Sequence, residues 1–151
     1  MDHPILIGWR EKVDLPYWGL FGLRAKADTG ARSSAIDVAQ VEELPGERVR
    51  FEVVTDRKDP EARHVLEADV VRRTRIRSSF GQAHDRLFVE TRLRLAGEEL
   101  VIELGLVCRK NMLSRMLLGR KTLEGRFAVD PGRRYLHKSK KRRSGPRASA
   151  G

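Results

Sequence analysis

Cysteine and aromatic residues are scarce in this chain of 151 residues. Cys108 is the only cysteine, which excludes an internal disulfide and fits a reducing compartment. Aromatic residues make up 6% of the sequence, too few to provide many stacking platforms for single-stranded nucleic acid. No apolar run approaches membrane-spanning length, and the apolar residues near the N-terminus are soon followed by Arg10, Glu11 and Lys12, unlike a signal peptide. We therefore expect a cytoplasmic protein with no membrane partner.

The sequence also lacks the common motifs for zinc and nucleotide binding. Zinc hydrolases use closely spaced ligands such as HExxH, but no two histidines here are paired at helical spacing (His3, His64, His84 and His137). A nucleotide-binding loop of the GxxxxGK[ST] type is missing as well. The sequence therefore predicts neither a metal site nor a cofactor.

Positive charge is unevenly distributed along the chain. The net charge is +10, but residues 138–151 contain six basic residues and no acidic residue, so the rest of the chain carries +4. This terminal segment has no apolar side chain beyond alanine, and we expect a disordered tail that follows a domain at residues 1–137. Two roles are compatible with such a tail, weak attraction of RNA through counterion release or solubilisation alone. The positive charge favours acidic partners.

Short apolar runs separated by turn residues dominate the sequence. Alternation with a period of two is clearest at Val49, Phe51 and Val53. Residues 96–99 indicate a hairpin connection and residues 55–63 an exposed loop between two antiparallel strands. This close spacing favours an antiparallel sheet or small barrel over βαβ units. The expected elements are strands at Ile5–Trp9, Leu20–Ala27, Arg48–Thr55, His64–Val71, Asp85–Ala96 and Glu98–Val107, one short helix at Gly119–Gly125, and a last strand within Arg126–Leu136.

The segment "AKADTGARSS" (residues 25–34) places an acidic residue directly after a strand-like run. Asp-Thr-Gly is ordinary turn chemistry, because Asp and Thr hydrogen-bond nearby backbone and Gly permits tight turning. The same arrangement can hold the Asp28 carboxylate facing a cleft. Two such carboxylates that meet across a symmetry axis share a proton, so that one acts as general base on water and the other as the acid. On its own, the tripeptide does not separate the two interpretations.

A second segment, "MLLGRKTL" (residues 116–123), is an apolar strand that runs into Gly-Arg and a short helix. Together with Asp28-Thr29-Gly30-Ala31, it resembles the retroviral-type aspartic proteases, in which a strand ending in Asp-Thr-Gly-Ala is followed later by an apolar pair, Gly-Arg and a helix. Lys121 stands where those proteases usually have Asn or Asp. The resemblance implies an all-β fold, a small closed antiparallel barrel of the retropepsin type.

The resemblance is closer still to one bacterial group of this superfamily. The group is often labelled "ATP-dependent zinc protease" and is found associated with RimK-type amino-acid ligases. It often has a histidine where this chain has Asp37, and a cysteine in the next strand region that is missing here, so no metal role is carried over. The matching segments are Ile7–Pro16, Lys26–Ile36, Arg48–Val53, Arg77–Gly81, Arg115–Pro131 and Tyr135–Leu136.

A single Asp-Thr-Gly per chain has a structural consequence. The sequence contains no second Asp-Thr-Gly or Asp-Ser-Gly, so aspartic-protease chemistry requires a homodimer that pairs two Asp28 loops. The resemblance then implies Asp28, Thr29 and Gly30 as catalytic residues, with Thr29 bracing the two loops, and Ala31 as a substrate-binding residue. It gives Arg120 a buried structural role near the same loop.

A site of this kind needs a lid that excludes solvent and grips an extended substrate. Arg75–Asp85 is the candidate flap, and we expect Ser78, Ser79 and Gly81 at its tip to bind substrate. The alternative interpretation is a polar loop between two strands.

The leading hypothesis is therefore a retropepsin-like aspartic endopeptidase that hydrolyses peptide or isopeptide bonds as a homodimer. The family's association with ligases suggests glutamate-rich tails as a target. Two alternatives stay open. One is an inactive peptide- or partner-binding module of the same fold, associated with RimK-type ligases, and the other is a nucleic-acid-binding barrel driven by the basic tail.

Overall fold

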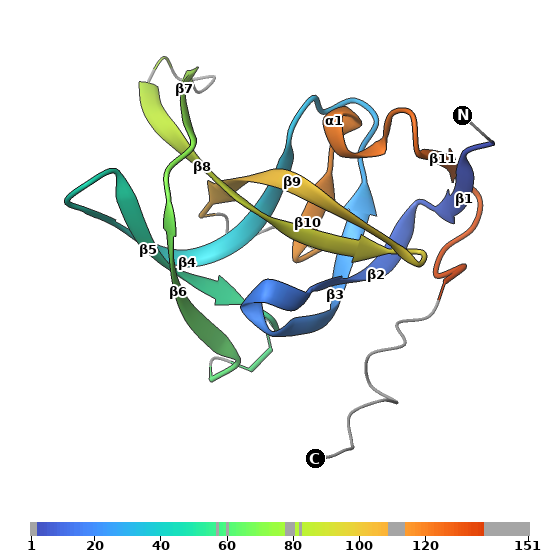
Figure 1. Ribbon diagram of the computed structural model, residues 1–151, viewed down its shortest axis with the longest axis horizontal. Coiled ribbons are helices and arrows are strands. Elements are labelled where there is room, and N and C mark those ends of the chain that lie inside the picture. The colour runs from blue at the N-terminus through green and yellow to red at the C-terminus, as the bar shows by residue number, and fades with distance from the viewer. Residues whose placement is uncertain are drawn as a thin grey trace.

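The computed structural model describes residues 3–56, 58–59, 61–77, 81, 83–108 and 114–137, and these residues are mostly β-strand (Figure 1). Among these described residues there is one short helix, α1 (Arg120–Leu123), which lies inside the expected range, and one 3₁₀ turn, η1 (Pro16–Trp18), which follows β2. Within the described part of the chain, no helix is long and apolar enough to cross a membrane. The strands are β1 (Ile5–Gly8), β2 (Arg10–Leu15), β3 (Leu20–Ala27), β4 (Ser34–Leu44), β5 (Arg48–Val54), β6 (Arg63–Asp69), β7 (Arg72–Arg77), β8 (Ala83–Leu95), β9 (Glu98–Val107), β10 (Met116–Leu118) and β11 (Phe127–Asp130).

Six of these strands form a closed barrel, which confirms the expected fold class. Their order is β10-β3-β2-β8-β9-β4, and β4 also pairs with β10, which closes the ring. Most neighbours are antiparallel, whereas the β10–β3 and β4–β9 contacts are parallel. Closure removes free edges from these strands.

The core is filled by alternate side chains of the strands. Val49, Phe51 and Val53 of β5 are 0%, 1% and 0% exposed, and Leu93 and Leu95 of β8 are 0% and 1% exposed. The period-two pattern in the sequence therefore identified core residues. Full burial of a side chain of this size contributes about 1.5–3 kcal/mol.

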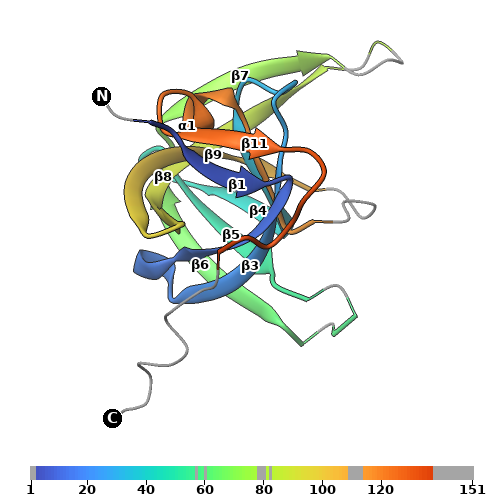
Figure 2. The same cartoon turned by 90° about the vertical axis from the view of Figure 1, so that its right-hand side faces the viewer.

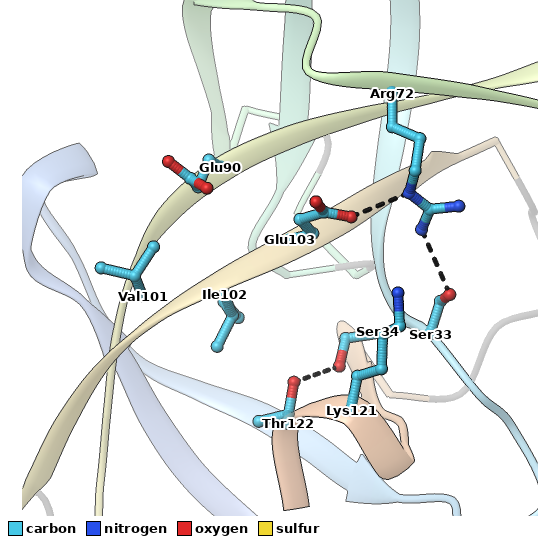
Figure 3. A pocket seen from close by; sticks show the side chains of 9 residues that line it. All are labelled: Ser33, Ser34, Arg72, Glu90, Val101, Ile102, Glu103, Lys121 and Thr122. Atoms are coloured by element: carbon cyan, nitrogen blue, oxygen red, sulfur yellow. Dashed lines mark hydrogen bonds and ion pairs between the residues drawn. The ribbon is translucent and has the colours of Figure 1, made fainter.

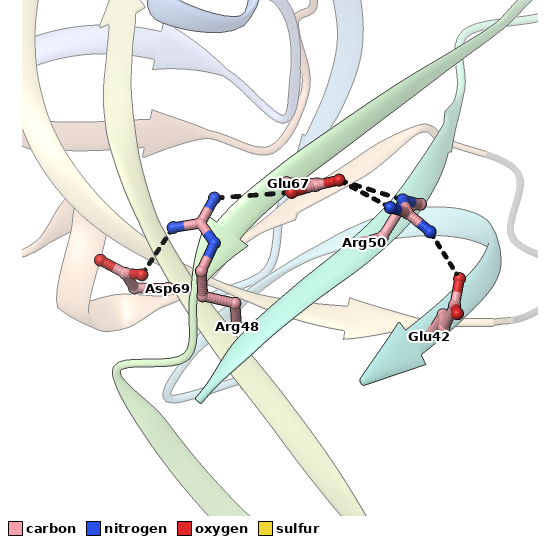
Figure 4. A network of polar contacts seen from close by, with 5 residues as sticks. All are labelled: Glu42, Arg48, Arg50, Glu67 and Asp69. Atoms are coloured by element: carbon pink, nitrogen blue, oxygen red, sulfur yellow. Dashed lines mark hydrogen bonds and ion pairs between the residues drawn. The ribbon is translucent and has the colours of Figure 1, made fainter. Parts of the chain in front are cut away.

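Two hairpins extend the sheet beyond the barrel: β5 and β6 continue from β4, and β7 pairs with β8. In Figure 1 the β7–β8 hairpin stands out at the upper left, with β5 and β6 below it. Cations face acids across β5 and β6, since Arg48 is the register partner of Asp69 and Arg50 that of Glu67 (Figure 4). The hydrogen bonds that Arg50 donates to Glu67 and Glu42 raise the pKa of its guanidinium above the ordinary value.

Two strands of the barrel, β2 and β4, were not predicted from the sequence. In β4 every residue of 34–38 is buried, so this half of the strand lacks the alternation of a half-exposed strand. In β2 the acidic residues Glu11 and Asp14 gave the sequence the composition of an exposed loop, although both are buried. Their carboxylates nevertheless accept backbone hydrogen bonds, Glu11 from Gly8 at 2.7 Å and Asp14 from Gly22 at 2.9 Å. The sequence did not predict this strand because it shows the charged residues but not the backbone N–H groups that pair with them.

The two ends of the described chain lie together. β1 and β11 form a separate two-stranded parallel sheet (Figure 2). The expected last strand within Arg126–Leu136 covers only Phe127–Asp130, because the following residues turn back onto β2. There the Glu11 carboxylate accepts the N–H groups of Leu136 and His137 at 2.9 and 3.2 Å. One buried side chain therefore fastens the end of the domain to its beginning.

Candidate active site

Two segments from opposite ends of the sequence meet where β3 ends. The backbone N–H of Asp28 donates to the carbonyl of Leu118 at 2.8 Å, and the N–H of Arg120 donates to the carbonyl of Ala31 at 2.8 Å. Residues 28–33, named the Asp28 loop below, are therefore fixed by backbone hydrogen bonds to the junction of β10 and α1.

Gly119 permits this contact because it has no side chain. A Cβ atom there would lie 2.4 Å from the carbonyl oxygen of Ser33, which belongs to the backbone of the Asp28 loop. The N–H of Gly119 donates to Ser34 Oγ at 2.9 Å, and Ser34 Oγ lies 2.7 Å from Thr122 Oγ1. Packing thus explains why glycine occupies the first position of the Gly-Arg motif. Glycine allows the close approach, and the buried hydroxyls of Ser34 and Thr122 hold α1 against β4.

The Asp28 carboxylate has features that fit both interpretations left open by the sequence. Its Oδ1 accepts the N–H of Gly30 at 3.0 Å, and the N–H of Ala31 donates to the Asp28 carbonyl at 3.1 Å, so the residue shapes a turn. Asp28 is also partly exposed, and it forms no ion pair with any described residue. A fixed, accessible carboxylate without a cationic partner can act on a water molecule.

Two of the other predicted residues of the loop are more accessible than Asp28. Thr29 and Gly30 are exposed, and Ala31 is partly buried. The Arg120 guanidinium donates to the Thr29 carbonyl at 3.1 Å, which places it beside the loop as expected. The expected burial of Arg120 is wrong for the single chain. This residue is exposed, because the buried residues of the one-turn helix α1 are Thr122 and Leu123.

The candidate flap is the tip of the β7–β8 hairpin. Ile76 is the register partner of His84, so two paired strands flank the tip. Gly81 has a φ of +85°, a conformation that favours glycine. Ser78 and Ser79 lie outside the described residues. The described ends of the candidate flap are therefore paired strands, and substrate binding by Ser78, Ser79 and Gly81 stays a prediction.

Arg72 connects the base of this hairpin to the Asp28 loop (Figure 3). Its Nε donates to Glu103 at 2.9 Å and its Nη2 to Ser33 Oγ at 3.4 Å. The guanidinium also stacks on the ring of Phe88, 3.8 Å from the centroid. Arg72, Ser33, Glu103 and Lys121 line a pocket of about 260 Å³ beside the loop. Sequence reasoning missed Arg72, since its partners come from strands distant in sequence.

A buried ion pair occupies the position where the resembling proteins often have a histidine. Asp37 and Arg115 are each 5% exposed, and Nη1 of Arg115 lies 2.5 Å from Oδ2 of Asp37. The N–H of Asp37 also donates to the Arg115 carbonyl at 2.9 Å. Among the residues that the structure describes, no group of three His, Cys, Asp or Glu side chains is arranged to hold a metal ion. The pair joins β4 to the segment before β10.

Comparison with known proteins supports this architecture. A family model described as "RimB-like: Retropepsin-like aspartic endopeptidase RimB" matches residues 6–140. The chain belongs to the RimB-like family. The resemblance to retropepsin-like proteases of the RimK-associated group is thereby confirmed.

Curated relatives of this RimB-like chain are longer proteins. It is 31% identical over 137 residues to a "Probable alpha-L-glutamate ligase" of Shewanella pealeana, and 32% identical over 134 residues to a protein of the same name from Parasynechococcus marenigrum. The alignments cover 89% and 87% of this chain but only 30% and 29% of those proteins. A solved structure, that of a Legionella pneumophila protein of unknown function, matches with a TM-score of 0.73 and 26% identity, covering 90% of this chain and 100% of that one.

Proposed function

We propose that this RimB-like protein is an aspartic endopeptidase that acts as a homodimer on peptide or isopeptide bonds. The observation that carries the proposal is the Asp28 carboxylate. It is held by the Gly30 N–H at 3.0 Å, is partly exposed, and has no ion-pair partner among the described residues. Membership of the retropepsin-like family and the closed barrel support the same assignment.

Each chain would supply half of the site. Thr29 and Gly30 are exposed, and pairing this surface with its copy in a second chain brings two Asp28 carboxylates together. Two carboxylates in contact share one proton, because both cannot stay ionised. The ionised Asp28 takes a proton from water as the water oxygen attacks the scissile carbonyl carbon, while the protonated Asp28 gives its proton to the carbonyl oxygen. Return of a proton to the leaving nitrogen completes the cleavage.

An acidic peptide is the substrate class that we propose. The chain carries a net charge of +10, which raises the local concentration of polyanions. The relatives that match the RimB-like chain bear the name "Probable alpha-L-glutamate ligase". A glutamate-rich peptide is therefore the first substrate to test.

Asp28→Asn tests the catalytic assignment directly. An amide cannot accept the proton of the attacking water, so fragment release from a glutamate-rich peptide, followed by mass spectrometry, should fall by about 10²–10⁴-fold. The circular dichroism spectrum and the solution mass should stay unchanged, because an amide oxygen can still accept the Gly30 hydrogen bond.

Asp130→Asn provides a matched control. Asp130 Oδ1 also accepts a backbone N–H two residues further on, from Gly132 at 2.9 Å, but the residue lies at the end of β11 and outside the Asp28 loop. This variant should keep full activity. Equal activity of Asp28→Asn and the unmodified protein would remove the aspartic mechanism. Peptide binding without cleavage by the unmodified protein would instead favour an inactive binding module.

A further inference from the structure

Cations face one another across the β2–β3 hairpin. The register pairs Lys12 with Arg24 and Arg10 with Lys26. The two positions on each strand are two residues apart, so all four side chains share one face of the hairpin. Lys12, Arg24 and Lys26 are exposed and Arg10 is partly exposed, whereas the residues between them, at positions 11 and 25, are buried. We name these four residues the cationic ladder.

This arrangement is costly, because like charges directly opposite each other on neighbouring strands destabilise a sheet. The β5–β6 hairpin shows the stabilising alternative, with Arg48 opposite Asp69 and Arg50 opposite Glu67 (Figure 4). No ladder cation forms an ion pair with a residue that the structure describes. Within the same part of the chain, the Nε atom of Arg10 is buried without a hydrogen-bond partner. The ladder therefore presents positive charge that an external anion can neutralise.

The end of the ladder farther from Asp28 opens into a pocket of about 510 Å³. Lys12 and Arg24 line it together with Lys58, from the connection between β5 and β6, and Arg115. Arg115 is held in its buried ion pair, and Asp56 is the one acid among the described residues that line the pocket. The concave surface thus carries an excess of positive charge, and a cleft of one sign concentrates ligands of the opposite sign.

The other end of the ladder leads to the Asp28 loop. Lys26 precedes Asp28 by two residues at the end of β3, or about 7 Å of extended chain, and Arg24 lies about 7 Å further back. An extended peptide also carries every second side chain on one side, at intervals of about 7 Å. Carboxylates on alternate residues of such a peptide therefore match the two rows, Lys12–Arg24 and Arg10–Lys26, in both spacing and charge.

We propose that the cationic ladder is a substrate-recognition site, which binds carboxylate side chains of an extended acidic peptide and directs the peptide to the Asp28 loop. Its biological role rests on the proposed peptidase function, but binding to the ladder does not require turnover. A peptide fits better than RNA. The Arg10 guanidinium lies 4.8 Å from the centroid of the Trp9 ring, and the Lys12 ammonium lies 5.9 Å from that of the Tyr135 ring. These cations occupy the rings that bases of RNA would need for stacking.

The test measures peptide binding in the full chain with Asp28→Asn, so that the peptide is not consumed. The probe is a fluorescein-labelled peptide of eight glutamates, titrated by fluorescence anisotropy at constant ionic strength. Adding Lys12→Gln and Arg24→Gln should weaken binding roughly tenfold, since two ion pairs of ordinary strength are lost. The thermal midpoint should not fall, because the like-charge contact is removed at the same time.

Arg48→Gln with Arg50→Gln is the matched control. It removes the same net charge from cations that already face acids, and binding should change less than about twofold. The basic residues of 138–151 are present in every variant, so their contribution cancels. Equal weakening by both double variants would overturn the proposal, because it would reveal attraction by total charge alone. Displacement of the peptide by an RNA octamer of higher affinity, lost with the ladder, would overturn it as well.

Failure of the ladder and failure of the peptidase assignment give different results. If binding depends on the ladder but the protein with Asp28 intact cleaves no peptide, the recognition site is supported and the peptidase assignment is refuted. Cleavage that depends on Asp28, with affinity unaffected by Lys12→Gln and Arg24→Gln, would do the reverse.

Discussion

Gly119 and Asp28 depend on each other, although one precedes α1 and the other follows β3. A Cβ at position 119 would lie 2.4 Å from the Ser33 carbonyl oxygen, so Gly119→Ala must push the Asp28 loop away from α1. We expect a loss of about 1–3 kcal/mol in the free energy of unfolding, measured by urea denaturation. Gly132→Ala is the control, because its nearest atom would be 3.5 Å away, and we expect a change within about 0.5 kcal/mol. Equal stability of the two variants would contradict this packing.

Residues in contiguous motifs were predictable, whereas residues defined by distant partners were not. Asp28-Thr29-Gly30 and Gly119-Arg120 each carry their geometry within a few residues, and the structure joins them through backbone hydrogen bonds. Arg72 and Arg115 are indistinguishable in sequence from the other arginines. Their roles depend on partners such as Glu103 and Asp37, which other strands supply. The cationic ladder likewise needs the register of β2 against β3, and β2 itself was missed.

At the scale of elements, the β7–β8 hairpin is tethered at its base by Arg72. Arg72→Gln removes the ion pair with Glu103 at 2.9 Å and the stacking on Phe88. We expect amide hydrogen exchange in β7 to accelerate about fivefold, which corresponds to a loss of about 1 kcal/mol, the net contribution of a typical intramolecular hydrogen bond. Mass spectrometry of peptic fragments measures it.

Arg75→Gln is the control for the tether. Arg75 pairs with Asp85 at 3.0 Å, but the two side chains are 71% and 44% exposed, and an exposed pair adds little stability. Exchange in β7 should stay unchanged. Equal acceleration in both variants would show that the hairpin responds to any lost charge.

The elements themselves differ in how far the sequence defines them. The alternating β5, β8 and β9 were predictable, because one face of each is largely buried and the other partly exposed. β4 was not, because residues 34–38 are buried on both faces and include Ser34 and Asp37, whose polar groups pair inside the protein. Closure of the barrel therefore depends on the strand with the weakest signal.

At the scale of the whole molecule, the proposed chemistry needs two chains. We expect sedimentation equilibrium to give about twice the chain mass of 17.2 kDa at the concentrations that support cleavage. Thr29→Arg, at an exposed position of the Asp28 loop, would place like charges at the two-fold axis and should yield inactive single chains. Gln40→Arg adds the same charge at an exposed position of β4 and should leave the mass and activity unchanged. Cleavage by single chains would refute the shared site.

The contact of His137 with β1 brings the two ends of the described chain together. Its Nε2 lies 2.8 Å from the Leu6 carbonyl oxygen, and Glu11 holds the same segment through the Leu136 and His137 N–H groups. The polypeptide thus enters and leaves the fold at adjoining points. A domain whose two ends adjoin can be linked to another domain at one place on its surface.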